Sequence, residues 1–264
     1  MGGLGNQLFQ YAFGRAISLK NSIPVYFDIT DYSRSTTNIK RDFELAKFPN
    51  IKAKYINSAF LRSAIRLKLI KKITDSEYDI SKKKYYSVKL TYFSGYWQNL
   101  HYFQDFEATI RKELDIPVLI NNQYFQQISQ KNSVSMHIRL SDYLLPDNAS
   151  IYKQLTSKYY IDSFDLIRSK IENPSFFIFS DDIEQAKQIL KDVKEDITYI
   201  DNNHNTFEDF RLMKACKHNI IANSTFSWWT AWLNQNNEKV VIVPKQWYTY
   251  NDVTNIYPED WVLI

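Results

Sequence analysis

Polar residues follow three apolar runs in the second half of the chain, in the segments 137–143 (H-I-R-L-S-D-Y), 180–182 (S-D-D) and 223–229 (N-S-T-F-S-W-W). In a parallel sheet, ligands bind beyond the carboxyl ends of the strands. If the three runs are strands of one such sheet, these segments meet at one of its edges. Each polar residue alone is ordinary loop chemistry, but their joint placement predicts a binding site.

Arg139 suits a phosphate in this site, because a guanidinium offers a rigid fork of donors that matches phosphate oxygens. His137 lies two residues earlier, so on an extended segment both side chains point the same way. Asp142 could orient Arg139 or act on a substrate proton. The alternative is a structural ion pair between Arg139 and Asp142 beside a hydrogen-bonded histidine, which composition alone favours.

The adjacent carboxylates of Asp181 and Asp182 have two interpretations. One of them can cap a following helix while the other contacts a base or a ribose. A pair of aspartates can instead hold Mg²⁺ or Mn²⁺. Because adjacent side chains diverge, we expect no metal here.

Ser224, Thr225 and Ser227 place hydroxyls at a predicted turn from a strand into a helix. Hydroxyls and backbone N–H groups at a helix N-terminus suit a phosphate group. Helix capping by Ser224 or Thr225 is the alternative, and the two roles are compatible.

The chain opens on a glycine-rich segment, G-G-L-G-N-Q at 2–7, before a predicted helix at 8–21. Glycine lets a backbone approach a ligand closely, and the helix N-terminus behind it suits phosphate. Such a loop normally follows a β-strand. We therefore expect the native chain to begin upstream of Met1.

An aromatic block at 95–103 (G-Y-W-Q-N-L-H-Y-F) suits contact with a sugar. Tyr96 or Trp97 could stack on a sugar ring while Gln98 bonds a hydroxyl group. A buried hydrophobic cluster is the alternative, and the sequence does not decide between them.

Residues 59–73 (A-F-L-R-S-A-I-R-L-K-L-I-K-K-I) predict a basic amphipathic helix. Such a helix could make peripheral contact with an anionic membrane. A packed helix with a solvated Arg/Lys face is the interpretation that we favour, because Lys and Arg commonly line exposed helix faces.

From residue 133 onward, predicted strands alternate with predicted helices, which indicates a parallel sheet covered on both faces. Earlier in the chain the pattern predicts a strand at 23–29 and helices at 103–114 and 120–129. The later strands are expected at 133–138, 175–179, 197–200, 219–222 and 239–243, and the helices at 157–172, 183–190, 206–214 and 225–234.

The composition excludes several classes of protein. The net charge of +4 is too small to indicate nucleic acid, but it suits a phosphorylated ligand. The single cysteine, Cys216, excludes an intrachain disulfide and a cysteine-built zinc site. No apolar run approaches the ~18 residues that span a bilayer. We expect a cytoplasmic protein, with peripheral contact to the inner membrane at most.

Taken together and in this order, six motifs resemble the bacterial α-1,2-fucosyltransferases of glycosyltransferase family 11. They are G-G-L-G-N-Q-L-F-Q-Y-A-F-G at 2–14, G-Y-W-Q at 95–98, H-I-R-L-S-D-Y at 137–143, F-S-D-D at 179–182, N-S-T-F-S-W-W at 223–229 and Y-P-E-D-W at 257–261.

The resemblance implies an α/β fold of the GT-B type, with two Rossmann-like lobes and a cleft between them. Residues 1–125 would form the acceptor-side lobe, and residues 126–264 the lobe that binds GDP-fucose. The implied reaction is an inverting, metal-independent transfer of fucose from GDP-β-L-fucose to the 2-hydroxyl of a galactose, in the synthesis of a surface polysaccharide or O-antigen. A GDP-sugar transferase of different linkage and a non-catalytic GDP- or glycan-binding protein are the rival hypotheses.

The resemblance also implies site residues. Arg139 would bind the β-phosphate. From the chemistry of inversion, Asp142 is the candidate base for the acceptor hydroxyl, with fixing Arg139 as its alternative role; a loose, oxocarbenium-like transition state would need little base. The implied donor site comprises Asn6, His137, Arg139, Asp181, Asp182, Ser224, Thr225, Phe226 and Ser227, and the acceptor site Tyr96, Trp97 and Gln98.

The chain departs from the family's pattern beside Arg139. Leu140 stands where the family has a second arginine, and Ser141 stands where a glycine is usual. We therefore expect Arg139 to carry the phosphate contact of this segment by itself.

Overall fold

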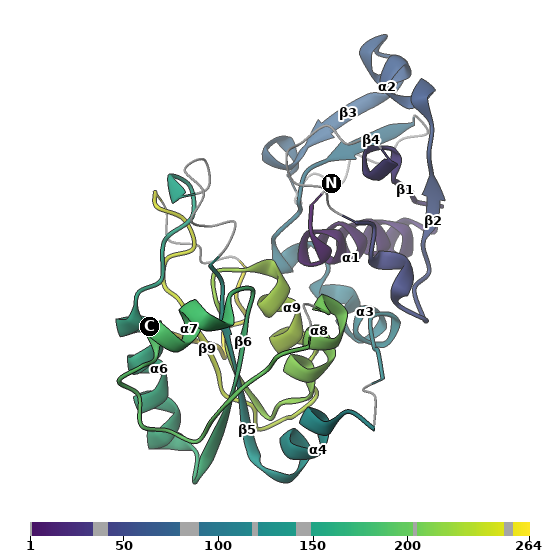
Figure 1. The fold of residues 1–264 in the computed structure, drawn as a ribbon. Coiled ribbons are helices and arrows are strands. Elements are labelled where there is room, and N and C mark those ends of the chain that lie inside the picture. Colours follow the sequence, from purple (N-terminus) through teal and green to yellow (C-terminus); the bar gives the residue numbers. More distant parts are fainter. Residues whose placement is uncertain are drawn as a thin grey trace. The chain divides into compact units, whose positions relative to one another are not determined.

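The computed structural model describes residues 2–33, 42–79, 90–117, 121–140, 149–202, 205–250 and 256–264. The chain divides into two compact units, Met1–Asp115 and Ile116–Ile264 (Figure 1). This division comes before the expected boundary after residue 125, because helix α4 (Gln123–Gln130) packs on elements of the second unit. The roles expected for the two lobes stay predictions.

In the described residues of the second unit, strands form one parallel sheet in the order β10-β9-β8-β5-β6-β7. The strands are β5 (Asn132–Ile138), β6 (Pro174–Ser180), β7 (Ile197–Tyr199), β8 (His218–Ile220), β9 (Val241–Val243) and β10 (Val262–Leu263). The helices besides α4 are α6 (Ser157–Lys170), α7 (Ile183–Ile189), α8 (Thr206–Ala215) and α9 (Thr225–Leu233). The predicted alternation is confirmed, and β10 adds a strand after the last predicted one.

Apolar residues line both faces of this sheet, because successive side chains of a strand point to opposite sides. Met136 and Ile138 of β5 pack with Phe164 of α6 on one face. On the other face, Phe177 and Phe179 of β6 pack with α8 and α4. Both faces are therefore covered, which buries the strands and leaves their ends for polar chemistry.

The first unit is built around α1 (Leu4–Asn21) and two parallel pairs of strands. The pairs are β1 (Tyr26–Asp28) with β2 (Lys54–Ile56) and β3 (Lys71–Thr74) with β4 (Thr91–Ser94), and the other helices are α2 (Ala59–Arg66) and α3 (Glu107–Glu113). Short 3₁₀ segments are η1 (Thr30–Ser33), η2 (Leu45–Lys47), η3 (Asp75–Glu77), η5 (Leu100–Tyr102) and η6 (Gln104–Phe106).

The helix predicted over 59–73 is wrong beyond Arg66. Lys68 adopts a left-handed φ of 58°, and its N–H donates to the carbonyl of Ile65 while that of Leu69 donates to Ala64. This pattern of hydrogen bonds ends a helix. Lys71 and the residues after it then pair with β4, so the apolar residues that fit a helical period serve a strand instead.

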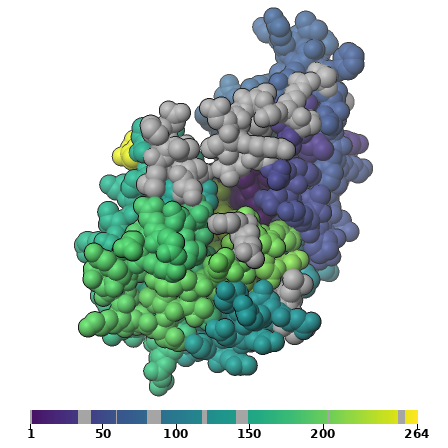
Figure 2. Space-filling model, viewed as in Figure 1, coloured from purple at the N-terminus to yellow at the C-terminus, as the bar shows by residue number. Residues whose placement is uncertain are grey.

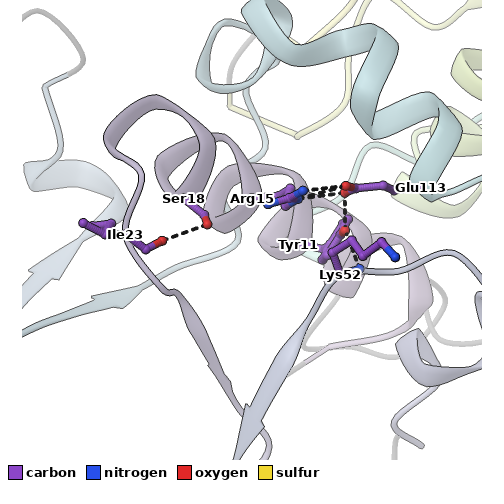
Figure 3. A network of polar contacts seen from close by, with 6 residues as sticks. All are labelled: Tyr11, Arg15, Ser18, Ile23, Lys52 and Glu113. Carbon is purple, nitrogen blue, oxygen red and sulfur yellow. Dashed lines mark hydrogen bonds and ion pairs between the residues drawn. The ribbon is translucent and has the colours of Figure 1, made fainter.

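A network of polar contacts ties α1 to α3 inside the first unit (Figure 3). The carboxylate of Glu113 accepts three hydrogen bonds from Arg15 at 2.7 to 3.0 Å and one from the hydroxyl of Tyr11. The Tyr11 oxygen in turn accepts from the N–H of Lys52 at 3.0 Å. Burial, followed by the bond to Glu113, raises the pKa of Tyr11 well above its ordinary value. The phenol therefore stays neutral and donates to the carboxylate.

Replacing Glu113 with alanine should lower the free energy of unfolding by about 3 kcal/mol. The side chain is 9% exposed, and its loss leaves the Arg15 guanidinium and the Tyr11 hydroxyl without their anion. Urea denaturation followed by circular dichroism measures the loss.

The matched control is Glu107→Ala on the same helix. Glu107 is 43% exposed and pairs with Arg111 at the surface, so its removal should cost no more than about 0.5 kcal/mol. Equal losses for the two variants would contradict the role assigned to the network.

Candidate functional site

The ends of three adjacent strands bring the predicted polar segments together in the second unit. β5 pairs with β6 on one side and with β8 on the other, all in parallel. The residues after β5 and β6 and the turn from β8 into α9 therefore lie at one edge of the sheet (Figure 1). This is the edge at which parallel sheets bind ligands.

Asp181 joins the segments that follow β5 and β6. One of its carboxylate oxygens lies 3.1 Å from Nη1 of Arg139, and the other accepts a hydrogen bond of 2.9 Å from the N–H of Leu140. Both side chains of the ion pair stay about one-fifth exposed, so the guanidinium is oriented and still reaches solvent. Burial, with the Asp181 charge as the second cause, raises the pKa of Tyr160.

Asp182 has a different task from its neighbour. It is the N-cap of α7, and its carboxylate accepts a hydrogen bond of 2.9 Å from the N–H of Gln185. The prediction that one of the adjacent carboxylates caps a helix is confirmed, and the two side chains diverge as expected. A contact of either one with a base or ribose stays a prediction.

His137 lies near the end of β5 and is 5% exposed. Its ring centroid is 5.7 Å from that of Phe226 in the first turn of α9. The histidine thus points to the face of the sheet that α9 covers, opposite to the face of Ile138.

The first turn of α9 follows directly from the edge of the sheet. Ser224 is the N-cap, and its carbonyl accepts from the N–H of Trp228 and from the hydroxyl of Ser227, which is fully buried. Within the described part of the chain, the Ser224 hydroxyl makes no capping bond. Thr225 and Phe226 are half-buried and form the part of this turn nearest to solvent.

Asn223 holds the neighbouring loops at this edge. Its side-chain amide donates to the carbonyls of Lys153 and Trp247, both at 2.8 Å, and the residue is 1% exposed. Its role in the structure is therefore to position the segments around the site.

Leu140 stands at the position where the resemblance implies a second arginine. Its side chain is 7% exposed and packs in the same apolar cluster as Tyr159 and Tyr160. Position 140 thus points into the core, and only its backbone N–H takes part in the site.

In the first unit, the glycine-rich segment and the G-Y-W-Q motif lie against each other. The amide of Gln98 donates to the side-chain oxygen of Asn6 at 2.8 Å. A Cβ placed on Gly2, whose φ is +120°, would lie 2.8 Å from Asn6 and 3.2 Å from Tyr96. The glycine is therefore required for this close approach. Asn6, Tyr96 and Gln98 form one polar surface of this unit.

Gln7 is a supporting residue that the sequence interpretation missed. It is 2% exposed, and its amide donates to the carbonyls of Gly2 and Asp42 while its oxygen accepts from the N–H groups of Glu44 and Leu45. A glutamine directly after the glycines, on the apolar side of a helix, was the available signal.

Trp97 differs from its neighbours in the motif. It is 2% exposed, its ring stacks on Phe13 at 3.9 Å, and its backbone N–H donates to the carboxylate of Asp75. Tyr96 by contrast is 47% exposed. The alternative of a buried cluster therefore describes Trp97, and acceptor binding by the motif stays a prediction.

Three further expectations concern the catalytic base, a metal site and a membrane-spanning helix. Asp142 lies outside the described residues. Among those that are described, no group of three or more His, Cys, Asp or Glu residues is placed to hold a metal ion. The helices found there include none that is long and apolar enough to cross a bilayer.

Among solved structures, that of a glycosyl transferase family 9 protein from Veillonella parvula is similar to this chain. The TM-score is 0.51 and the identity 8%, over 100% of this chain and 84% of the other. At this identity the likeness concerns the fold alone. It agrees with the parallel α/β architecture and confirms the expected GT-B class.

Three named relatives are similar in sequence. An alpha-1,2-colitosyltransferase of Escherichia coli is 36% identical over 287 residues, covering 100% of this chain and 96% of the relative. The O-antigen biosynthesis glycosyltransferase WbnK of Escherichia coli is 30% identical over 299 residues, which cover 99% of this chain and 97% of the relative. Human galactoside alpha-(1,2)-fucosyltransferase 1 is 25% identical over 162 residues, which cover 55% of this chain and 43% of the relative.

The match to the family covers the whole chain, residues 1–264. It includes the glycine-rich segment of the first unit and the strand-end segments of the second. The protein is therefore a glycosyltransferase that belongs to Glycosyl transferase family 11.

Proposed function

We propose that this protein transfers L-fucose from GDP-β-L-fucose to the 2-hydroxyl of a terminal galactose, with inversion, in the synthesis of a surface polysaccharide such as an O-antigen. The observation that carries the proposal is Arg139, held by Asp181 at the sheet edge from which α9 begins. The α-1,2 linkage in the names of two relatives supports the linkage.

The proposed chemistry requires a group that stabilises departing GDP. As the bond between the fucose carbon and the β-phosphate oxygen breaks, negative charge develops on that oxygen. The Arg139 guanidinium and the N–H groups of the first turn of α9 are donors suited to this charge. Because Asp181 already orients the guanidinium, little reorganisation accompanies the reaction. We propose that these donors act without a metal ion.

The acceptor hydroxyl must lose its proton as its oxygen bonds to the fucose carbon. We propose Asp142 as the base that takes this proton, with a loose, oxocarbenium-like transition state as the alternative that needs little base. Asn6, Tyr96 and Gln98 are the proposed acceptor-side contacts, because they share one surface of the first unit. His137 is the proposed contact to guanosine.

A second donor has a specific observation in its favour. The relative that is 36% identical is named as a colitosyltransferase. Colitose is fucose without its 3-hydroxyl, so GDP-colitose would use the same phosphate contacts. The two donors differ by one hydroxyl, and only a contact to that group discriminates between them.

Transfer assays with GDP-fucose and GDP-colitose, each with lactose as a β-galactoside acceptor and with a chelator added in parallel, test the proposal. We expect transfer from GDP-fucose that survives the chelator, with an α-1,2 linkage by NMR. Faster transfer from GDP-colitose would favour the second donor. Tight binding of GDP without transfer to any β-galactoside would overturn both.

Arg139→Ala should lower kcat/KM by roughly 10²–10³-fold, the usual effect of losing one donor to a transition-state charge. Arg139→Lys should recover only part of the activity, because it keeps the charge but loses the planar fork. Steady-state kinetics measure both. Arg168→Ala, which removes an exposed arginine of α6, is the control and should retain full activity. Near-normal turnover of the alanine variant would refute the assigned role.

Substitution of Asp181 should change the affinity for GDP, whereas substitution of Asp182 should change the stability of the protein. Asp181→Asn should weaken GDP binding by about fivefold, because the guanidinium loses the orientation that an ion pair worth about 1 kcal/mol gives it. Asp182→Ala should lower stability by about 1 kcal/mol through the lost cap, with little change in GDP affinity. Calorimetric titration with GDP and thermal unfolding measure the two. Weaker GDP binding by Asp182→Ala, with unchanged GDP binding by Asp181→Asn, would contradict the roles that we assign to the two carboxylates.

A further inference from the structure

The first unit exposes a group of large apolar side chains that the proposed reaction does not use. Phe60 is 85% exposed, Leu67 69%, Leu69 73% and Leu90 74%. These are the most exposed large hydrophobic residues in the described part of the chain. We call these four residues the apolar tip.

The local fold gathers these residues at one place. Phe60 and Leu67 are seven positions apart, so they share a face of α2 and its C-cap. Leu69 follows in the turn that ends the helix. The N–H of Lys71 donates to the carbonyl of Leu90 at 3.2 Å, because β3 and β4 begin side by side. Leu69 and Leu90 thus lie at the same end of this pair of strands.

Figure 2 shows the residues of α2 and its turn, in blue, at an extremity of the first unit. The helix also has an inner apolar side, where Leu61, Ala64 and Ile65 are half-buried. Helix α2 therefore packs on the first unit through that inner side. The apolar tip is not needed for this packing and stays exposed.

The surroundings of the apolar tip are positively charged. The exposed basic residues next to it are Arg66, Lys68, Lys71 and Lys72. No aspartate or glutamate occurs anywhere in residues 51–74. Of the nearby acids, Asp31 is engaged in an ion pair with Arg62. Glu77 accepts hydrogen bonds from Thr74 and lies within electrostatic range of Lys71 and Lys72, so the rim has more cations than anions.

We propose that the apolar tip and its basic rim are a docking surface for an anionic membrane. Exposed Phe and Leu side chains beside Lys and Arg are the composition of segments that lie in the membrane interface. The apolar side chains would enter the boundary between headgroups and acyl chains, and the cations would lie at the anionic headgroups. A protein partner with an acidic rim is the competing occupant. The lipid surface is favoured because exposed cations border the apolar tip and residues 51–74 contain no acidic side chain, which matches the charge of anionic headgroups.

Vesicle sedimentation tests the proposal, using vesicles that contain phosphatidylglycerol and vesicles of phosphatidylcholine alone. We expect binding to the anionic vesicles that weakens as salt is raised, because salt screens the cations. The combined variant Phe60→Ser, Leu67→Ser, Leu69→Ser and Leu90→Ser should bind at least about tenfold more weakly. Lys68→Glu with Lys72→Glu should lose the preference for anionic lipid.

The matched control is Ile161→Ser with Tyr250→Ser, which removes exposed apolar residues of the second unit and should bind as the parent chain does. Circular dichroism checks that every variant is folded. Absence of vesicle binding by the parent chain, or equal binding by the serine variant, would overturn the proposal. Self-association that the serine variant abolishes, seen by analytical ultracentrifugation without vesicle binding, would assign the apolar tip to a second copy and equally overturn it.

Discussion

The parallel pairing of β5 with β6 and β8 is the constraint on which the candidate site depends. Met136 pairs with Ile178 on one side and with Ile220 on the other. Since the three strands run the same way, the loops after them must share one edge. The slip of a single residue in β5 would turn His137 to the opposite face of the sheet. The apolar core therefore determines the chemistry at the edge as well as the stability of the unit.

Much of the second unit was predictable, because its buried strands are continuous apolar runs followed by helices of ordinary length. The pairing of Arg139 with Asp181 was not predictable. Sequence proximity suggested Asp142, which lies outside the described residues and stays a prediction, while Asp181 is contributed by the neighbouring strand. Only the order of the strands brings Asp181 to the guanidinium. Capping by Asp182 was among the predicted options, since a cap depends on local sequence.

The first unit was harder to predict, because its strands are short and its tertiary contacts override the local sequence pattern. Its strands have three or four residues, too few to show a period of two. Residues after Arg66 keep a helical spacing of apolar side chains, yet they pair with β4, because tertiary contacts outweigh local propensity. An aromatic residue such as Trp97 gives the same signal whether it packs in a core or stacks on a sugar. Its left-handed φ of 59° has no signature in the sequence.

Leu140 carries a consequence for substitution at this position. Its side chain is part of the core that includes Tyr160. An arginine placed here would bring a charge into apolar surroundings, at a high cost in solvation. The core could accept that charge only if its neighbouring residues changed as well. Substitutions at Leu140 and at its core neighbours are therefore energetically coupled.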